Sequence, residues 1–383
     1  MAEDRGSNLA EVMRLALQLG ATAFGGPAAH TALLRREAVA RRGWVADARF
    51  LDLMGLTNLI PGPNSTELVM LIGRERAGWR GLWFGGLCFI LPASLLTLGF
   101  AWLYERYGTT PAGGDLLRGI QPVILAVVAQ AVWGLGRTAV RGAFGAILAV
   151  GVVALSLAGG NELVLLFGAG VVALGRTVAS EGRIGALVLA LPIPLWWPVP
   201  LVATAGGDPR DLSRLFGIFL KIGATLYGSG YVLVAFLRND LVARTGWLTE
   251  AQLLDAVAVG QVTPGPVFTT ATFVGYLVGG VPGAVLATVG IFLPAFLFVA
   301  VAAPLLPRLR RSRWLSAALD GINLAAIGLM GAVTWTLGRE ALDAAWTVVL
   351  AVAALVLLVR FRVNSVWIIA AGGAAGLLAG AAS

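Results

Sequence analysis

Apolar runs long enough to cross a lipid bilayer are the feature that most constrains this fold. A helix needs roughly 20 apolar residues to span the hydrocarbon core. Five stretches reach that length, namely 81–104, 115–136, 184–204, 283–304 and 315–337. Only 13% of the 383 residues are charged, whereas water-soluble domains carry about 25%. The sequence therefore predicts an all-α polytopic membrane protein. We also expect its first segment to be retained, because no small-residue cleavage site follows it.

Residues that hold metals or carry out nucleophilic chemistry are scarce. The only cysteine, Cys88, lies in an apolar run, and the only histidine is His30. A single cysteine forms no internal disulfide and no thiolate cluster, and no HExxH motif or carboxylate cluster at ligand spacing occurs. We therefore expect no metal, no cofactor and no enzymatic activity. An intramembrane enzyme acting on an anion is the remote alternative.

The net charge of +8 raises the question of a nucleic-acid partner. The arginines lie in short loops beside the predicted spans, where basic residues mark the cytoplasmic side of a membrane protein. We therefore expect the lipid bilayer as the partner, and no nucleic acid.

One module occurs twice in the chain. Residues 19–63 align with 222–266 without a gap, and 18 of the 45 pairs are identical. The match includes Pro-Gly-Pro at 61–63 and 264–266, and after one deleted residue it continues as far as Arg137 and Arg339. We predict an N-terminal repeat over 1–182, a linker transmembrane segment over 183–204 and a C-terminal repeat over 205–383.

Loop charges indicate how the repeats are oriented. One set of alternating loops has a total charge of +11 and comprises 74–80, 137–141, 176–183, 308–313 and 360–362. The other set has −3 and comprises 105–118, 161–162, 208–211, 276–282 and 339–343. Cytoplasmic loops keep Arg and Lys, and equivalent loops of the two repeats fall in opposite sets. This pattern favours inverted repeats over parallel ones, with the N-terminus in the cytoplasm.

Glycine and proline interrupt the apolar segments at equivalent places. Segment 9–30 either spans the membrane or forms a hairpin that turns at "FGGP"; we favour the hairpin, because it keeps the arginines at 35–42 cytoplasmic. Segment 50–73 is interrupted by Pro-Gly-Pro, since proline lacks an amide proton and fits a first helical turn. A broken backbone within a membrane is tolerated only where protein buries it or it faces a wet cavity. We therefore predict re-entrant helices near the midplane.

These breaks predict an anion site. Free N–H groups and the positive dipole end at the start of each following helix attract negative charge, and hydroxyl and amide side chains stand beside them. The predicted substrate-binding residues are Gly25, Gly26, Pro27, His30, Pro61, Gly62, Pro63, Asn64, Ser65, Thr66, Lys221, Gly228, Ser229, Gly230, Pro264, Gly265, Pro266, Thr269 and Thr270.

Two of these residues, Lys221 and His30, are not repeated as lysine or histidine in the other repeat. Lys221 aligns with Gln18, and His30 aligns with Leu233. Lys221 is interpreted as a fixed cation beside the anion, the alternative being a side chain that reaches the membrane interface. His30 is either a polar cap at the end of the hairpin or a group that binds ligand or protons.

Acidic residues and duplicated arginines suggest scaffold roles. Asp52 and Asp255 occupy equivalent sites; we expect salt bridges to nearby arginines, and proton coupling is the alternative. Glu67 is interpreted as a first-turn acid that complements the helix dipole, the alternative being a site residue. The arginines at 35, 41, 238 and 244 recur in both repeats, which suggests a shared structural duty; electrostatic gathering of anions is the alternative.

The combination of motifs resembles the chromate ion transporter family in its long, two-module form. "FGGPAAH" at 24–30, both Pro-Gly-Pro turns and the duplicated layout carry the resemblance over essentially the whole chain. It implies an inner-membrane exporter of chromate, with sulfate as the nearest analogue, and it transfers to Gly25, Gly26, Pro27, His30 and the two turns. The second copy reads "YGSGYV" at 227–232, which departs from the signature and puts symmetric use of the half-sites in doubt.

An exporter of a dianion needs no ATP, because the membrane potential favours outward movement of negative charge by about 2.3 kcal/mol per charge per 100 mV. A proton gradient is the other energy source. An anion channel would share the broken helices and differ only in coupling. The sequence leaves the oligomeric state open, with a homodimer as one option.

Overall fold

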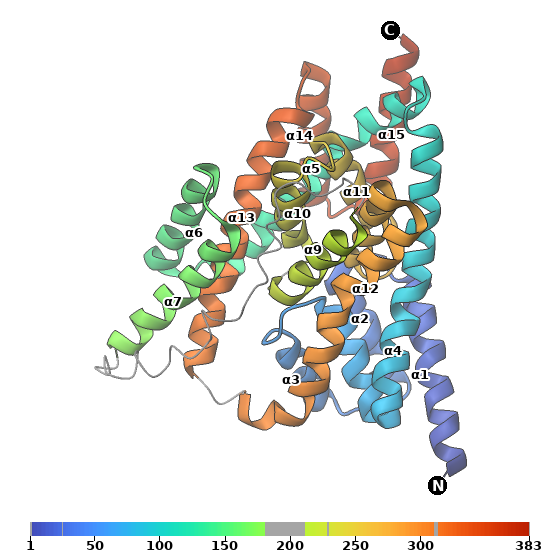
Figure 1. Cartoon of the computed structure of the whole chain (residues 1–383), viewed down its shortest axis with the longest axis vertical. Coiled ribbons are helices and arrows are strands. Elements are labelled where there is room, and N and C mark those ends of the chain that lie inside the picture. Colours follow the sequence, from blue (N-terminus) through green and yellow to red (C-terminus); the bar gives the residue numbers. More distant parts are fainter. Residues whose placement is uncertain (1, 25, 181–210, 228–229, 310–312, 383) are drawn as a thin grey trace.

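The structure is a computed structural model that describes residues 2–24, 26–180, 211–227, 230–309 and 313–382 (Figure 1). Every regular element in these ranges is a helix. The predicted span 184–204 and the linker 183–204 lie outside the described residues.

The first repeat contains eight of the described helices, one of them a π-helix, η1. They are α1 Ala2–Thr22, α2 Gly26–Arg35, η1 Arg36–Arg41, α3 Asp47–Thr57, α4 Asn64–Tyr107, α5 Pro111–Ala139, α6 Gly142–Leu157 and α7 Glu162–Ser180.

The second repeat follows the same order, with two additional 3-10 turns, η2 and η4, and a second π-helix, η3. Its described helices are α9 Leu212–Thr225, η2 Gly230–Val232, α10 Leu233–Leu237, η3 Arg238–Arg244, α11 Glu250–Val262, η4 Val267–Thr269, α12 Thr270–Leu309, α13 Arg313–Ala341, α14 Ala345–Arg360 and α15 Ser365–Ala382.

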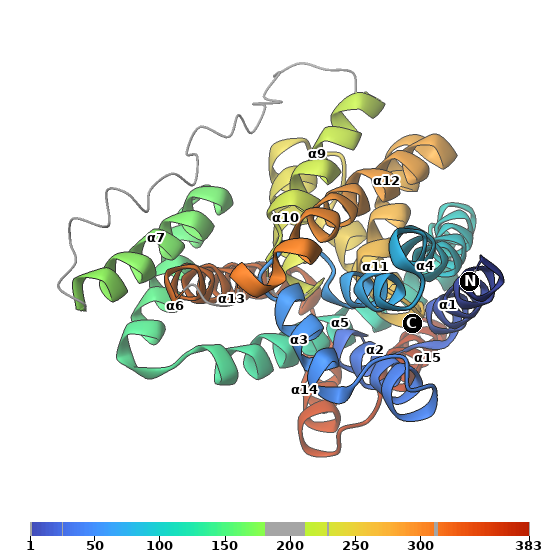
Figure 2. The same ribbon diagram turned by 90° about the horizontal axis from the view of Figure 1, so that it is seen from below.

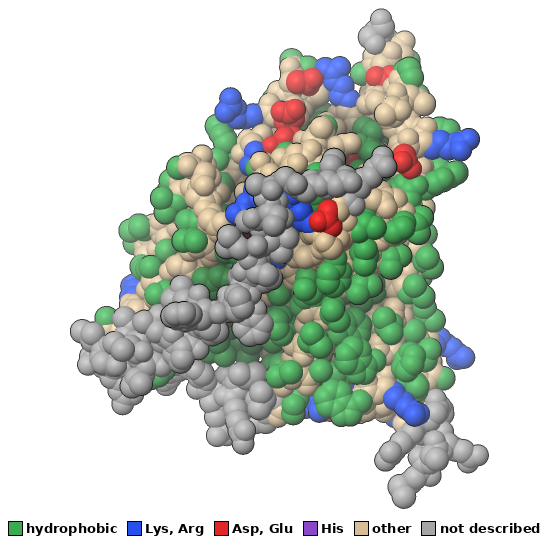
Figure 3. Space-filling model, in the orientation of Figure 1, with side chains coloured by type: hydrophobic (Ala, Val, Ile, Leu, Met, Phe, Trp, Pro, Cys, Tyr) green, Lys and Arg blue, Asp and Glu red, His purple; other side chains and the backbone are tan. Residues whose placement is uncertain are grey.

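Within the described residues, five helical stretches are long and apolar enough to cross a membrane: Asn64–Tyr107, Pro111–Ala139, Glu162–Ser180, Val267–Pro304 and Trp314–Ala341. Four of them contain the predicted spans at 81–104, 115–136, 283–304 and 315–337. Figure 3 shows a broad hydrophobic area on one face, with charged side chains mostly toward its upper and lower edges. The all-α polytopic fold is confirmed.

The last helix of each repeat packs on a helix of the other repeat, and the two contacts involve equivalent helices. α7 of the first repeat packs on α13 of the second, and its counterpart α15 packs on α5. The pairs α4–α12 and α5–α13 join equivalent helices directly. Figures 1 and 2 place α4 beside α12, with α6 and α7 on the flank opposite α1. The repeats therefore share one core under an approximate two-fold relation, and their inverted orientation in the membrane stays a prediction.

The helix breaks occur where the sequence predicts them. α1 ends at Thr22 and α2 begins at Gly26, while α3 ends at Thr57 and α4 begins at Asn64. Within the Pro-Gly-Pro turns, Gly62 has a φ of 137° and Gly265 a φ of 86°, values that glycine alone adopts without strain.

Two long helices also reverse direction at equivalent glycines. Gly78 in α4 and Gly280 in α12 have φ values of 64° and 61°. A Cβ atom added to Gly73 would overlap the carbonyl oxygen of Gly81, although residues eight apart in a straight helix are about 12 Å apart. The chain therefore doubles back near Gly78, so that α4 is a short helix followed by a long antiparallel one.

Glycine also permits close packing of α9 on α12. A Cβ atom at Gly223 would overlap the backbone oxygen of Ile291, as one at Gly20 would overlap that of Phe89. Backbone cannot rotate away as a side chain can. We therefore expect Gly223→Ala to reduce the stability of the purified protein by about 1–3 kcal/mol, measured by thermal unfolding in detergent. Gly151→Ala is the matched control, because nothing lies within 4 Å of its Cβ position. Equal stability of both variants would contradict this prediction.

Candidate functional site

Each Pro-Gly-Pro turn is hydrogen-bonded to the broken helix of the other repeat. The amide of Gly62 donates to the carbonyl oxygen of Leu226 at 2.9 Å, and the amide of Gly265 donates to that of Ala23 at 3.0 Å. The four residues are equivalent in pairs. The carbonyls follow the last turns of α9 and α1, where backbone oxygens lack partners within the helix. The two turns and the two breaks therefore form one reciprocal assembly between the repeats.

A cavity of about 1320 Å³ adjoins this assembly. The first turn contributes Pro63, Asn64 and Ser65, and the second contributes Pro266. The helix breaks contribute Phe24, Ala29, Gly230 and Val232. The structure therefore brings parts of all four predicted segments to one space, although they lie up to about 240 positions apart in the chain.

The cavity is positively charged. Its charged lining residues are Arg137, at the end of α5, and Arg362, beyond α14, and no aspartate or glutamate lines it among the described residues. Neither arginine forms an ion pair within the part of the chain that the structure describes. Apolar residues make up much of the remaining lining, and among them stand neutral hydrogen-bonding side chains: Thr57, Asn58, Asn64, Ser65, Gln130, Thr138, Asn323, Asn364 and Ser365. Such a lining suits an anion that needs both charge and directed donors.

Arg362 occupies a backbone position that suits glycine. Its φ is 53°, the one positive value of a non-glycine residue in the described ranges. The equivalent residue of the first repeat is Gly159, with a φ of 89°. Left-handed backbone costs an ordinary residue about 1–2 kcal/mol. Residues held in such conformations cluster at functional sites, and here the strained residue carries one of the two charges in the cavity.

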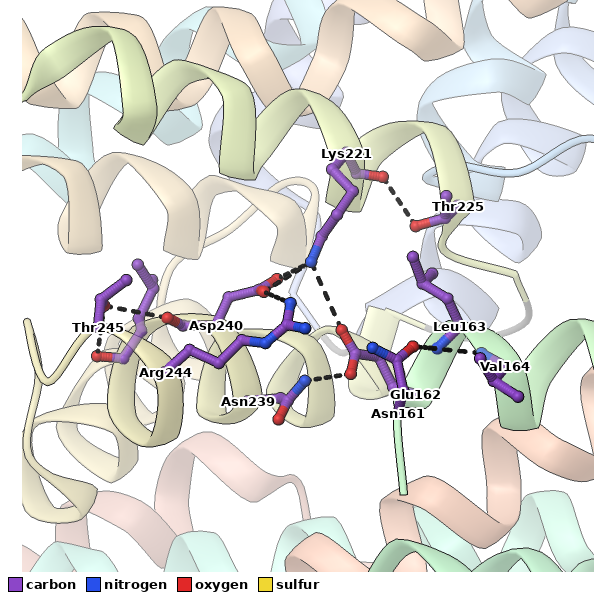
Figure 4. A network of polar contacts seen from close by, with 11 residues as sticks. Asn161, Glu162, Leu163, Val164, Lys221, Thr225, Asn239, Asp240, Arg244 and Thr245 are labelled. Atoms are coloured by element: carbon purple, nitrogen blue, oxygen red, sulfur yellow. Dashed lines mark hydrogen bonds and ion pairs between the residues drawn. The ribbon is translucent and has the colours of Figure 1, made fainter. Parts of the chain in front are cut away.

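Lys221 lies in a different place, a polar network that joins the two repeats (Figure 4). Its Nζ atom is 2.5 Å from Asp240 Oδ2 and 3.5 Å from Glu162 Oε1. Arg244 also contacts Asp240 at 3.4 Å, and Asn239 donates to Glu162. The Lys221 side chain is 16% exposed, and both carboxylates are 4% exposed. Lys221 does not line the cavity, and its charge is balanced by two acids.

His30 connects the two arms of the first break. Its Nε2 atom is 3.0 Å from the carbonyl oxygen of Ala23, and its ring packs edge-on against Phe89. The side chain is buried and does not line the cavity. This geometry matches the polar-cap alternative.

Asp255 corrects one expectation. The sequence predicted a salt bridge to a nearby arginine, but the Asp255 carboxylate accepts hydrogen bonds from the Tyr104 hydroxyl at 2.8 Å and the Gln121 amide at 3.1 Å. Both donors come from the first repeat, so this buried acid joins the repeats. Asp52 is half-buried on α3.

The four duplicated arginines form equivalent ion pairs. Arg35 binds Asp47 and Arg238 binds Glu250, each at 2.7 Å. Likewise Arg41 contacts Glu37 at 3.3 Å, as Arg244 contacts Asp240. The hydrogen bonds from Arg35 hold the pKa of Asp47 below its ordinary value. Matching ion pairs in both repeats are consistent with a structural role for these arginines.

The remaining predicted residues either do not line the cavity or lie outside the described residues. The hydroxyls of Thr269 and Thr270 donate to the carbonyls of Pro266 and Val267, each at 2.8 Å, so they stabilise the turn and do not face the cavity. Residues of the turns that are buried away from the lining are Pro61, Gly62, Thr66, Pro264 and Gly265. Gly26 begins α2. Gly25, Gly228, Ser229 and the side chain of Pro27 lie outside the described residues.

Sequence reasoning missed both cavity arginines. Arg137 and Arg362 were counted as loop charges that indicate topology. One signal was present for Arg362, because it aligns with Gly159 in a repeat where loop glycines otherwise tend to recur. Arg137 gave no such signal, since Arg339 matches it.

Duplicated helical repeats, reciprocal breaks and a cationic cavity define an integral membrane protein of the anion-transporter class. The chain belongs to the chromate transporter family, whose profile matches residues 10–174 and again residues 213–377.

Curated relatives agree with this assignment. The chromate transport protein of Cupriavidus metallidurans is 30% identical over 96% of this chain and 92% of its own length. That of Pseudomonas aeruginosa is 34% identical over 84% of this chain and 79% of its own length. A probable chromate transport protein of Synechococcus elongatus is 30% identical over 88% and 86%. No solved structure matches the chain.

Proposed function

We propose that the protein exports chromate from the cytoplasm across the inner membrane, with the cavity between the repeats as the substrate site. The observation that carries the proposal is the cavity lining, in which two arginines without ion-pair partners and several neutral donors meet no carboxylate in the described residues. A tetrahedral dianion requires this combination, because charge-assisted hydrogen bonds are about twice as strong as neutral ones. The substrate class rests on the family.

The positions of the cavity arginines support this direction of transport. Arg137 and Arg362 belong to the loops with the excess of positive charge, which the positive-inside rule assigns to the cytoplasm. The cavity then opens toward the cytoplasm, and inverted repeats let it open alternately to the other side. Outward movement of a dianion is favoured by about 4.6 kcal/mol at 100 mV, twice the value for one charge. The membrane potential is sufficient as the energy source.

Sulfate has nearly the same shape and charge as chromate, so we propose that it binds in the same cavity. The test is chromate uptake into everted membrane vesicles, with and without excess sulfate. We expect uptake that depends on the protein and on the membrane potential, and that sulfate reduces. Chromate uptake that excess sulfate leaves unchanged would contradict a general oxyanion site, and vesicles that take up no chromate would contradict export. Uptake against an imposed chromate gradient distinguishes a transporter from a channel.

A further inference from the structure

Glu67 is a fully buried carboxyl group with no partner. Its exposure is 0%, and neither carboxylate oxygen forms a hydrogen bond within the described residues. No described arginine or lysine forms an ion pair with it. The sequence predicts a first-turn acid that complements the dipole of α4. The structure leaves it unpaired.

The carboxyl lies against the first Pro-Gly-Pro turn, which borders the anion cavity. Glu67 follows Ser65 by two residues in the first turn of α4, and Ser65 lines the cavity. A Cβ atom added to Gly62 would overlap Glu67 Oε1, so the side chain folds against the Pro-Gly-Pro turn. The hydroxyl of the intervening Thr66 is also buried without a partner. Unpaired polar groups therefore gather at the start of the helix whose positive end faces the cavity.

Few charged groups surround this carboxyl. Across the first turn, Ala295 of α12 lies against Gly62. Among the described residues, the phenol of Tyr227 in the second break interacts electrostatically with Glu67. A phenol offers no positive charge, and an ionised carboxylate buried without donors is strongly disfavoured, whereas the protonated form is tolerated.

The fold itself does not require a carboxyl here. The deleted residue of the second repeat falls in this turn, so the counterparts of Glu67 are Thr269 and Thr270. Their hydroxyls donate to the carbonyl oxygens of Pro266 and Val267, each at 2.8 Å. The corresponding turn therefore forms with short, satisfied side chains. A larger, unsatisfied acid in the first repeat points to a role beyond the scaffold.

We propose that Glu67 is a proton-binding site coupled to the oxyanion cavity: the carboxyl holds a proton while the dianion is bound. The inference rests on the proposed function. A carboxylate and a dianion at the positive end of one helix repel each other, so anion binding favours the protonated acid. Thermodynamic linkage is reciprocal, so a lower pH strengthens anion binding, and anion binding takes up a proton. Each dianion then moves with one proton and one net negative charge, so the membrane potential drives this export half as strongly as it would drive the dianion alone.

The first test measures proton uptake when sulfate is added to the purified protein in weakly buffered detergent solution. Sulfate stays a dianion over the accessible pH range, so the substrate contributes no protons. We expect up to one proton taken up per sulfate bound by the wild-type protein once the pH is high enough to ionise Glu67 in the sulfate-free protein, and none by Glu67→Gln at any pH. Sulfate binding without proton uptake by the wild-type protein at every pH at which sulfate binds overturns the inference, whether or not the variants fold.

The second test measures how sulfate affinity depends on pH. One coupled proton weakens binding by up to about tenfold per pH unit above the titration of Glu67. We expect this slope in the wild-type protein and a flat profile in Glu67→Gln. Glu67→Thr, which installs the residue of the second repeat, should also be flat. Equal slopes in the wild-type protein and both variants overturn the coupling alone. If the wild-type protein binds neither chromate nor sulfate, the proposed function and this inference are both overturned.

Discussion

Chromate transport should be lost when both cavity arginines are removed together, as Arg137→Gln with Arg362→Gly. A hydrogen bond to a charged group contributes about 1.5–3 kcal/mol, so we expect each single variant to raise the apparent KM about 10- to 100-fold and the pair to abolish measurable uptake. Uptake of chromate into everted vesicles measures the effect. Arg339→Gln is the matched control, because Arg339 is the equivalent of Arg137 in the second repeat and does not line the cavity.

Arg362→Gly also separates binding from folding. Glycine adopts the left-handed backbone of Gly159 and Arg362 without the cost of about 1–2 kcal/mol that an ordinary residue carries. The variant should therefore be as stable as the wild-type protein or more so, while its transport falls. A variant that loses stability and transport together, or that transports normally, would contradict the assignment of Arg362 to the substrate cavity.

Lys221→Gln should destabilise the protein by about 3–5 kcal/mol, because removal of one partner from a buried ion pair leaves an uncompensated charge. The lost ammonium balances Asp240 and Glu162, which are both 4% exposed. Glutamine is the residue at the equivalent position, Gln18, so the substitution is tolerated by the helix. Thermal unfolding of the purified protein measures the effect.

A second substitution tests the cause. Asp240→Asn in the Lys221→Gln background removes one of the two carboxylates that Lys221 balanced, and we expect it to restore part of the lost stability. If Lys221 instead binds the anion, Lys221→Gln will weaken chromate transport at unchanged stability, and Asp240→Asn will restore nothing.

The sequence predicted the parts of the fold that depend on short-range patterns. Apolar length identified four described spans, and Gly-Pro chemistry located the breaks before Gly26 and Asn64. Self-alignment found the duplication, which the two family matches confirm. These features are local, so neighbouring residues suffice to reveal them.

The site depends on packing that no local pattern encodes. Arg362 reaches the cavity because the segment after α14 lies near the end of α5, which carries Arg137. Lys221 looked like an isolated membrane charge because its partners, Asp240 and Glu162, lie 19 and 59 positions away. Asp255 likewise finds Tyr104 and Gln121 in the other repeat. Whether a charged side chain has an ion-pair or hydrogen-bond partner therefore depends on residues of the other repeat.

The crossed amide bonds of Gly62 and Gly265 make each half of the chain depend on the other. A single repeat alone would bury its Pro-Gly-Pro amide with no acceptor, since the acceptor belongs to the other half; within a bilayer such an orphan is costly. One repeat would therefore need a second copy of itself, and a chain that contains both supplies it. The two copies need not be identical elsewhere: the first carries Glu67 where the second has threonine, and the second carries Arg362 where the first has Gly159.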